Sequence, residues 1–370
     1  MNKMKKLLSI SLIGIITLSC SSVTKDWYNN DKAMYIKFAA TMDSLIYTEV
    51  TPDSMNLAYF EGFSDELLFI HYFMASMGYG QIIYQYPELD EKYIKNMEYC
   101  IDMMLTPAVK AYDSDVWGED PIEGVYNNTT KAHGAYLNYL NMALSLHNVV
   151  SKRSKYAKLN DLISLHIVKQ LKKSQYSLIE TYPDQYYPAD ISAALGSLGL
   201  YKQATGKQWK KVMWEATKDF DMLFRDSTGL VYHQIYITDE LHYSEARGAS
   251  TAFSAYFMSF VNMVIARRLF ESIEINLYTE YPLLAGVREY KEGVDGGMDE
   301  DSGPIVLGLG TAATGFTLAS TKTFKHKKMF NKIFSVSSKV GGAVNTDTTF
   351  MYKRGSYIGN SIMFAMLTAF

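Results

Sequence analysis

Helical periodicity with very little strand alternation is the feature that most constrains the fold of this chain. Beyond residue 32, apolar residues recur at i, i+3, i+4 and i+7 in one segment after another, which predicts a protein built of α-helices. The expected helices cover 33–48, 65–85, 91–110, 131–151, 155–180, 188–204, 207–223, 247–268, 270–284, 303–321, 325–337 and 356–369. Strand-like alternation is rare, and 230–237 is expected to form one arm of a short β-hairpin.

The expected helices are of two kinds. Residues 189–201 and 303–319 carry Gly, Ala and Ser on several faces and almost no charge, so we expect these helices to be buried on all sides. Neighbouring helices such as 156–174 and 207–220 have lysine-rich outer faces. An inner ring of buried helices alternating with an outer ring of amphipathic ones predicts an all-α fold, an (α/α)6 toroid of about six helix pairs. A solenoid is the competing layout, but no fixed repeat period is visible. Residues 33–370 are expected to form this single domain.

The first 19 residues predict an export signal. Three lysines precede an apolar run over 7–18, which is too short for a membrane span of about 20 residues. Cys20 follows directly, flanked by serines, and this arrangement resembles a bacterial lipoprotein signal in which the cysteine is acylated. We therefore expect a signal peptide over 1–19 and a lipidated tether over 20–32. The protein would then be anchored in the bacterial cell envelope, facing the periplasm or the cell surface. The alternative is plain secretion with a free Cys20.

Composition excludes several classes of function. The 36 basic and 39 acidic residues give a net charge of -3, and loss of the signal peptide removes three lysines and no acid. A nucleic-acid binder would show a basic excess or a basic face, and neither is present. Two cysteines exclude a disulfide-rich scaffold and a cysteine-based zinc site. Cys100 is expected to be a small core residue, and the seven histidines have no metal-ligand spacing. No metal and no cofactor are expected.

In a toroid, the loops that precede the inner helices meet at one mouth. The loops at 117–128, 182–190, 245–247 and 295–301 combine acids, amides and aromatic residues, which is the usual composition of a ligand pocket. The candidate substrate-binding residues are Trp117, Asp120, Glu123, Thr181, Tyr186, Tyr187, Tyr232, Arg247, Asp295 and Asp301.

Two residues at helix starts are candidates for acid–base chemistry. His133 lies near the start of an expected inner helix, where the helix dipole disfavours the imidazolium and leaves a neutral base or hydrogen-bond donor. Asp190 lies at the start of the next inner helix among tyrosines, which would desolvate its carboxylate and raise its pKa. The alternatives are that His133 merely packs and that Asp190 merely caps its helix.

The segment 120–123 (DPIE), the helix start Lys131-Ala132-His133 and the segment 182–190 (YPDQYYPAD) with the helix after it resemble the linalool dehydratase/isomerase family. The resemblance implies an (α/α)6 toroid, an extracytoplasmic location, a homo-oligomer, and isoprenoid alcohols as substrates that gain or lose water. It places His133 on the pocket histidine of the family and Tyr187 on an aromatic wall. The two pocket cysteines of the family correspond to Thr181 and Asp190, and of these only the aspartate exchanges protons readily near neutral pH.

Three hypotheses follow from the sequence. The leading one is a lyase or isomerase acting on a small hydroxylated substrate, with Asp190 and His133 as the acid–base pair. The second is a glycoside hydrolase or polysaccharide lyase on the same six-hairpin scaffold, with an oligosaccharide substrate and Asp120, Glu123 or Asp301 as a second carboxylate. The third is a lipoprotein without catalytic activity that binds a glycan or a partner protein.

Overall fold

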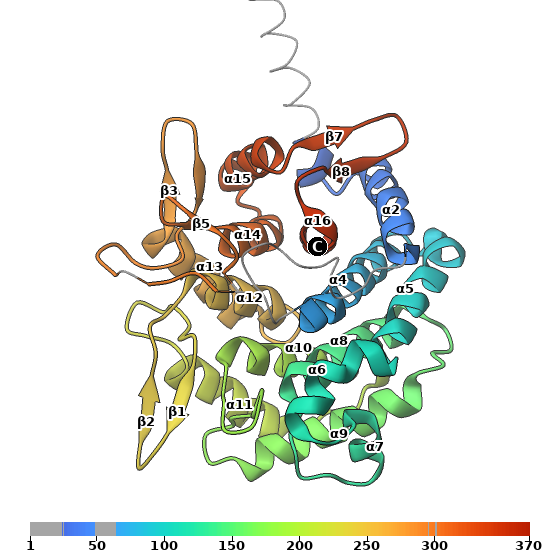
Figure 1. The fold of residues 1–370 in the computed structure, drawn as a ribbon, viewed down its shortest axis with the longest axis vertical. Coiled ribbons are helices and arrows are strands. Elements are labelled where there is room, and N and C mark those ends of the chain that lie inside the picture. Colours follow the sequence, from blue (N-terminus) through green and yellow to red (C-terminus); the bar gives the residue numbers. More distant parts are fainter. Residues whose placement is uncertain (1–23, 25, 49–63, 295, 300–301) are drawn as a thin grey trace, which may run out of the picture.

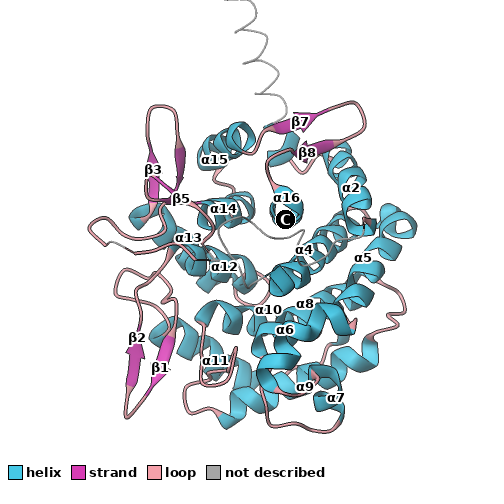
Figure 2. Ribbon diagram, in the orientation of Figure 1, coloured by secondary structure: helices cyan, strands magenta, loops and turns pink. Residues whose placement is uncertain are grey.

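The structure, a computed structural model, describes residues 24, 26–48, 64–294, 296–299 and 302–370, and most of these residues are helical (Figures 1 and 2). The expectation of a mainly α-helical protein is confirmed. Strands occur only as four small antiparallel two-stranded sheets among the described residues. The predicted signal peptide and Cys20 lie outside the described residues.

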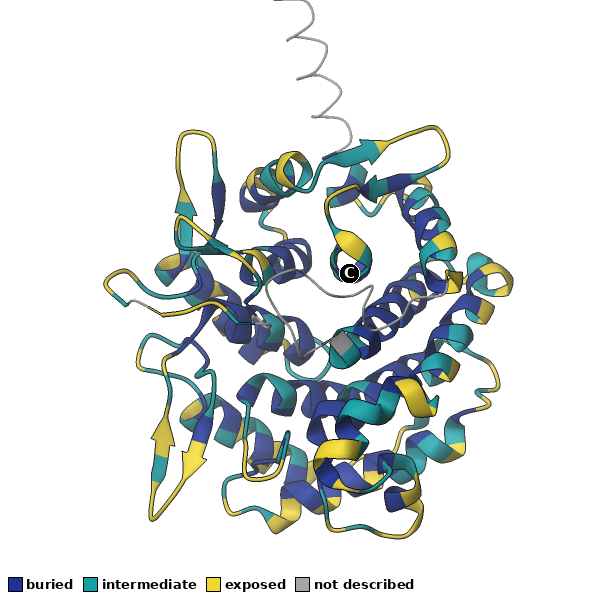
Figure 3. Ribbon diagram, in the orientation of Figure 1, coloured by how far each residue is buried: buried dark blue, intermediate teal, exposed yellow. Residues whose placement is uncertain are grey.

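Six helices pack in a closed cyclic order. They are α4 (Ser64–Gln85), α8 (Gly134–Val150), α10 (Pro188–Thr205), α12 (Gly248–Met258), α14 (Thr311–Thr323) and α16 (Ser356–Thr368). Each packs against the next in this order, and α16 packs against α4 (Figure 1). These helices are buried on most faces (Figure 3), as their small and apolar residues require.

A second set of helices covers the first from outside. It consists of α2 (Lys32–Tyr47), α5 (Asp90–Met104), α9 (Ala157–Lys173), α11 (Lys210–Leu223), α13 (Met263–Asn276) and α15 (Lys327–Val340). Each of these packs against one or two of the six helices above. In α15, for example, Met329, Phe330, Ile333 and Phe334 are buried while the lysines face outward. The shorter helices η1 (Pro87–Leu89), α6 (Pro107–Trp117) and α7 (Pro121–Tyr126) complete the helical set.

The sheets are hairpins that connect helices. Strands β1 (Ile235–Ile237) and β2 (Leu241–Tyr243) form the hairpin whose first arm the sequence predicted within 230–237. Three further hairpins were not predicted. They pair β3 (Tyr278–Glu280) with β4 (Ala285–Val287), β5 (Ile305–Val306) with β6 (Leu309–Gly310), and β7 (Ala343–Asn345) with β8 (Phe350–Tyr352).

Several predicted helices had wrong boundaries. The helix expected at 270–284 is not a separate element, because α13 continues to Asn276 and Tyr278–Glu280 is strand β3. The helix expected at 155–180 ends at Lys173. Three further differences have a local reason. The segment 91–110 divides before Pro107, because the residue preceding a proline avoids helical geometry. The segment 247–268 divides at Asn262. The side chain of Asn262 accepts hydrogen bonds from the backbone N–H groups of Val264 and Ile265, and this cap starts α13. The helix predicted at 303 begins at Thr311, because Gly303, Leu307 and Gly308 have φ angles of 58°, 54° and 79°.

Close approach of α10 to α12 depends on glycine. A Cβ atom at Gly196 would lie 2.5 Å from the backbone oxygen of Phe257 and 2.6 Å from Cε of Met142. Gly315 in α14 is different, because the nearest atom to its Cβ position is Sδ of Met363 at 3.8 Å. The two positions therefore separate the effect of helix propensity from the effect of packing.

We expect Gly196→Ala to lower the free energy of unfolding by about 1–3 kcal/mol, because a backbone oxygen cannot move aside for the new methyl group. Gly315→Ala should raise it by about 0.5–1 kcal/mol, because alanine is the better helix former and the site is open. Urea denaturation of both variants measures the difference. A stabilised Gly196→Ala variant would contradict the close packing of α10 and α12.

Candidate functional site

A cavity of about 840 Å³ lies where the N-terminal ends of α4, α10, α12, α14 and α16 come together. One group of its lining residues is apolar and comes from the β5–β6 hairpin, α14, α15 and α16: Val306, Leu309, Phe316, Val336, Val340, Ile358, Ile362 and Met363. A second group is polar and comes from α4 and the segments leading into α10, α12 and α14: Glu66, Thr181, Tyr182, Tyr187, Asp190, His233 and Asp299. The cavity thus combines an aliphatic wall with several carboxylates.

Asp190 lies in the first turn of α10 and lines this cavity. Its Oδ1 accepts a hydrogen bond from the hydroxyl of Tyr139, and its Oδ2 accepts one from Oγ1 of Thr181 at 2.7 Å. Burial raises the pKa of Asp190 above its ordinary value of 3.8, and the two hydrogen bonds oppose that rise. The carboxyl group is fixed on both oxygens, as a positioned proton donor or acceptor requires.

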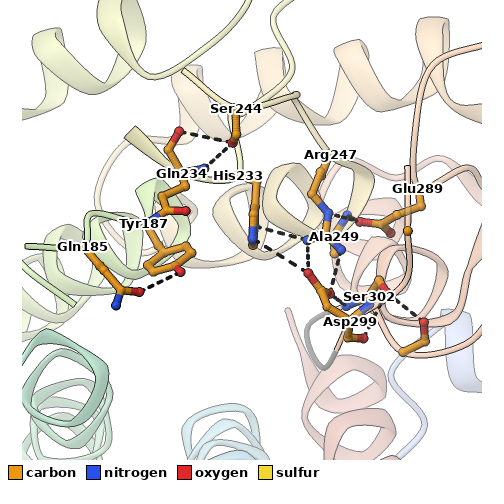
Figure 4. A network of polar contacts seen from close by, with 12 residues as sticks. Gln185, Tyr187, His233, Gln234, Ser244, Arg247, Ala249, Glu289, Asp299 and Ser302 are labelled. Carbon is orange, nitrogen blue, oxygen red and sulfur yellow. Dashed lines mark hydrogen bonds and ion pairs between the residues drawn. The ribbon is translucent and has the colours of Figure 1, made fainter. Parts of the chain in front are cut away.

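A second carboxylate of the cavity, Asp299, belongs to a buried ionic network (Figure 4). Arg247, the residue before α12, donates from Nη2 to Asp299 Oδ1 at 2.8 Å and from Nε to Glu289 Oε1 at 2.9 Å. Although burial acts to raise the pKa of Asp299, the hydrogen bonds and positive charge of Arg247 hold it below 3.8. Asp299 is therefore ionised over the physiological range, in contrast to the upward shift at Asp190.

His233 is next to this network and lines the same cavity. Its Nδ1 lies 3.3 Å from Nη1 of Arg247, which is always a donor, so Nδ1 acts as the acceptor and the proton resides on Nε2. Nε2 lies 3.8 Å from Oδ2 of Asp299. Burial, reinforced by the charge of Arg247, lowers the pKa of His233 to about 4. Tyr187 packs against the imidazole edge to face at 5.2 Å, so His233 presents a neutral N–H donor beside an aromatic ring.

The structure does not bring His133 to the cavity. His133 is fully buried with a left-handed backbone, and its Nδ1 lies 2.6 Å from Oδ2 of Asp113 on α6. Its Nε2 lies 3.4 Å from Glu119, and the ring packs on Trp117 at 5.0 Å. Both ring nitrogens thus face carboxylates of the α6–α7 region. The hypothesis that His133 and Asp190 act as a pair therefore has no support from the lining of this cavity.

Other candidates divide between the cavity and structural roles. Asp120 caps α7 through hydrogen bonds from the backbone of Ile122 and Glu123, at 2.9 and 3.1 Å, and pairs with Lys110. Of the candidate substrate-binding residues that the structure describes, only Thr181 and Tyr187 line the cavity. The other described candidates do not line the cavity: Trp117, Asp120, Glu123, Tyr186, Tyr232 and Arg247. Asp295 and Asp301 lie outside the described residues.

The candidate residues named from the sequence do not include six residues of the cavity lining or its ionic network: Glu66, Tyr139, Tyr182, His233, Glu289 and Asp299. Tyr139 lies in the second turn of α8, beyond the helix start on which the candidate residues were predicted. Glu66 accepts a hydrogen bond from the hydroxyl of Tyr182 at 2.6 Å, and an acid in the first turn of a buried helix was a usable signal. For Glu289 no sequence signal was present.

No family model and no curated protein matches this chain. Among the described residues, no helix is long and apolar enough to cross a membrane. Within the same residues, no group of three or more histidines, cysteines or acids is arranged to hold a metal ion. The function must therefore be argued from the cavity.

We expect Arg247→Met to lower the free energy of unfolding by about 3–5 kcal/mol near neutral pH, because it leaves the buried carboxylate of Glu289 without its cation. Burial already raises the pKa of Glu289, and loss of Arg247 raises it further. The folded variant then holds a proton that the unfolded chain releases, so its stability increases as the pH falls from 8 to 5.

The matched control is Arg268→Met, which removes an exposed arginine 2.8 Å from Asp221. Surface pairs of this kind contribute at most about 1 kcal/mol. Urea denaturation at several pH values compares the two variants. Equal stability of both, or a deficit in Arg247→Met that does not change with pH, would contradict the proposed role of the network.

Proposed function

We propose that this protein is an acid–base enzyme of the lyase or isomerase type, acting on a hydroxylated and largely apolar small molecule. The observation that supports it is the presence of Asp190 and Asp299 in the lining of one cavity to which the β5–β6 hairpin, α14, α15 and α16 contribute a mainly apolar wall. The proposal keeps Asp190 from the sequence analysis and replaces His133 by Asp299 as the partner.

Asp190 is the proposed general acid. Burial shifts its pKa upward, which increases the fraction that carries a proton, and the Tyr139 and Thr181 hydroxyls fix its orientation. Asp299 is the proposed base, because Arg247 keeps it ionised. Two carboxylates whose surroundings move their pKa values in opposite directions have the division of labour that acid–base catalysis needs.

In a dehydration, Asp190 would give its proton to the substrate hydroxyl, and the C–O bond would break with both electrons leaving on water. Asp299 would remove a proton from the adjacent carbon, whose C–H electrons form the double bond. The rings of Tyr139 and Tyr187 would face the electron-poor carbon between these events. The Nε2–H of His233 would bind a substrate oxygen. Hydration is the same sequence in reverse.

The closed cyclic packing of six helices, each covered from outside, supports assignment of the fold to the (α/α)6 toroids. The same arrangement agrees with the resemblance to the linalool dehydratase/isomerase family. That resemblance and the acylation signal at Cys20 also support an anchored location in the cell envelope.

A glycoside hydrolase is the second candidate, because two carboxylates in one cavity also satisfy the needs of glycoside hydrolysis. Sugar-binding sites, however, present many hydrogen-bonding groups, and the wall formed by α14, α15 and α16 is mainly aliphatic. This contrast favours an isoprenoid-like alcohol over an oligosaccharide.

A thermal-shift panel with isoprenoid alcohols and oligosaccharides separates these proposals. A ligand at 100 times its dissociation constant stabilises a protein by about 2.7 kcal/mol, which is a measurable shift. Stabilisation by the alcohols, followed by product detection with gas chromatography, would support the lyase. Stabilisation by sugars alone would favour the hydrolase, and binding without product would favour a binding protein.

With the alcohol that binds best, Asp190→Asn should lower kcat by about 10²–10⁴, the usual contribution of general acid–base catalysis. Since the acid must be protonated, activity of the parent enzyme should fall as the pH rises through the raised pKa of Asp190. Asp184→Asn is the matched control, because Asp184 is exposed in the same loop and its φ of 62° suits asparagine. Full activity of Asp190→Asn would exclude Asp190 as the acid.

A further inference from the structure

Three exposed apolar side chains, here called the apolar rim, belong to segments that also contribute to the cavity lining: Leu283, Leu307 and Val340. Leu283 is 88% exposed at the tip of the β3–β4 hairpin, Leu307 is 67% exposed in the β5–β6 turn, and Val340 ends α15. Leu284, Val306 and Val340 line the cavity. Val306 and Val340 both line the cavity and are exposed, so the cavity is open to solvent beside the apolar rim.

In a protein surrounded only by water, a leucine at position 307 is unfavourable for two reasons, its backbone conformation and the exposure of its side chain. It is the first residue of a two-residue turn with φ angles of 54° and 79°, where asparagine followed by glycine is the preferred pair. A leucine there carries the strain of the left-handed backbone and also exposes its side chain. Insertion of the Leu307 side chain into an apolar environment would remove it from water and would explain why leucine occupies this position.

We propose that the apolar rim docks on the surface of a lipid bilayer, with the opening of the cavity against the membrane. The membrane that the apolar rim contacts would be the same bilayer to which an acylated Cys20 would tether the chain. Trp27 packs against Phe350 of β8 at 5.1 Å, and Tyr352 of the same strand lines the cavity. The first described residue, Thr24, is four residues after Cys20, and four extended residues span at most about 14 Å. An acyl anchor on Cys20 would therefore hold the membrane close to Thr24, three residues before Trp27 and its contact with β8.

Charge next to the rim fits an anionic lipid surface. Lys339, Lys353 and Arg354 are exposed, and Nη1 of Arg354 donates to the backbone oxygen of Val340 at 3.1 Å. Across the described ranges, none of these three cations has a carboxylate within 4 Å. Such cations bind anionic headgroups, while the apolar side chains enter the interface below them.

This inference goes beyond the proposed function and does not depend on it. Docking needs no chemistry in the cavity, and the residues of the rim that we would change, Leu283 and Leu307, do not line it. If both proposals hold, a substrate dissolved in the bilayer reaches Asp190 without passing through water.

Co-sedimentation with vesicles tests the docking. The chain from residue 20 onward with Cys20→Ser carries no acyl group, and it should sediment with vesicles of phosphatidylcholine and phosphatidylglycerol. The double variant Leu283→Gln/Leu307→Asn should partition roughly tenfold less, since it loses two inserted side chains. The matched control is Val264→Gln, which changes a side chain that is 61% exposed on the first turn of α13. Equal binding of the parent and the double variant would overturn the proposal.

Two further measurements distinguish loss of membrane contact from misfolding of the variant. Leu307→Asn alone should raise the thermal unfolding temperature, because asparagine suits this backbone, while it weakens vesicle binding, so misfolding cannot explain the loss. A solvent-sensitive fluorophore on Leu307→Cys should shift to the blue with vesicles, and one on Val264→Cys should not. Buried Cys100 stays unlabelled. Absence of both sedimentation and the blue shift would overturn docking, while activity toward a soluble alcohol would remain unaffected.

Discussion

The contact between α16 and α4 is the constraint on which the rest of the structure depends. Nε2 of Gln81 on α4 donates to the backbone oxygen of Ala365 at 2.8 Å and to Oγ1 of Thr368 at 3.1 Å. The ring of Phe364 occupies the space where a side chain at Gly78 would stand. This contact closes the cyclic order of six packed helices, and both α4 and α16 contribute residues to the cavity lining. The cavity is therefore lined in part by two helices whose contact joins segments almost 290 residues apart in sequence.

Helix identity was predictable from sequence because it depends on neighbours three and four positions away. The buried character of α10 and α14 also followed from their small residues. The β3–β4, β5–β6 and β7–β8 hairpins were missed because strands of two or three residues are too short for alternation to be visible. They matter for the site, since Leu284, Leu309 and Tyr352 all belong to these segments and line the cavity.

Asp190 was identified as a candidate from its place at a helix start, and the cavity includes it. His133 satisfied the same criterion, but its ring bonds with Asp113 on α6, and a sequence pattern cannot say which side of a helix start faces inward. In the sequence, Asp299 is only one of several acids in the predicted pocket loop 295–301. Its distinction comes from Arg247, which is 52 residues away in sequence and 2.8 Å away in space. Which of several neighbouring acids pairs with Arg247 can therefore be seen only in the tertiary structure.

The long sequence separation of α4 and α16 also bears on how the protein reaches its location. Pairings between distant segments form slowly, because the entropy of closing a long loop must be overcome first. The export signal predicted from residues 1–19 would direct the chain across a membrane. With α4 lacking its partner until α16 has been synthesised, the core cannot be completed early. If the predicted signal directs an unfolded chain across a membrane, late closure of the helix cycle would keep the chain competent for that passage.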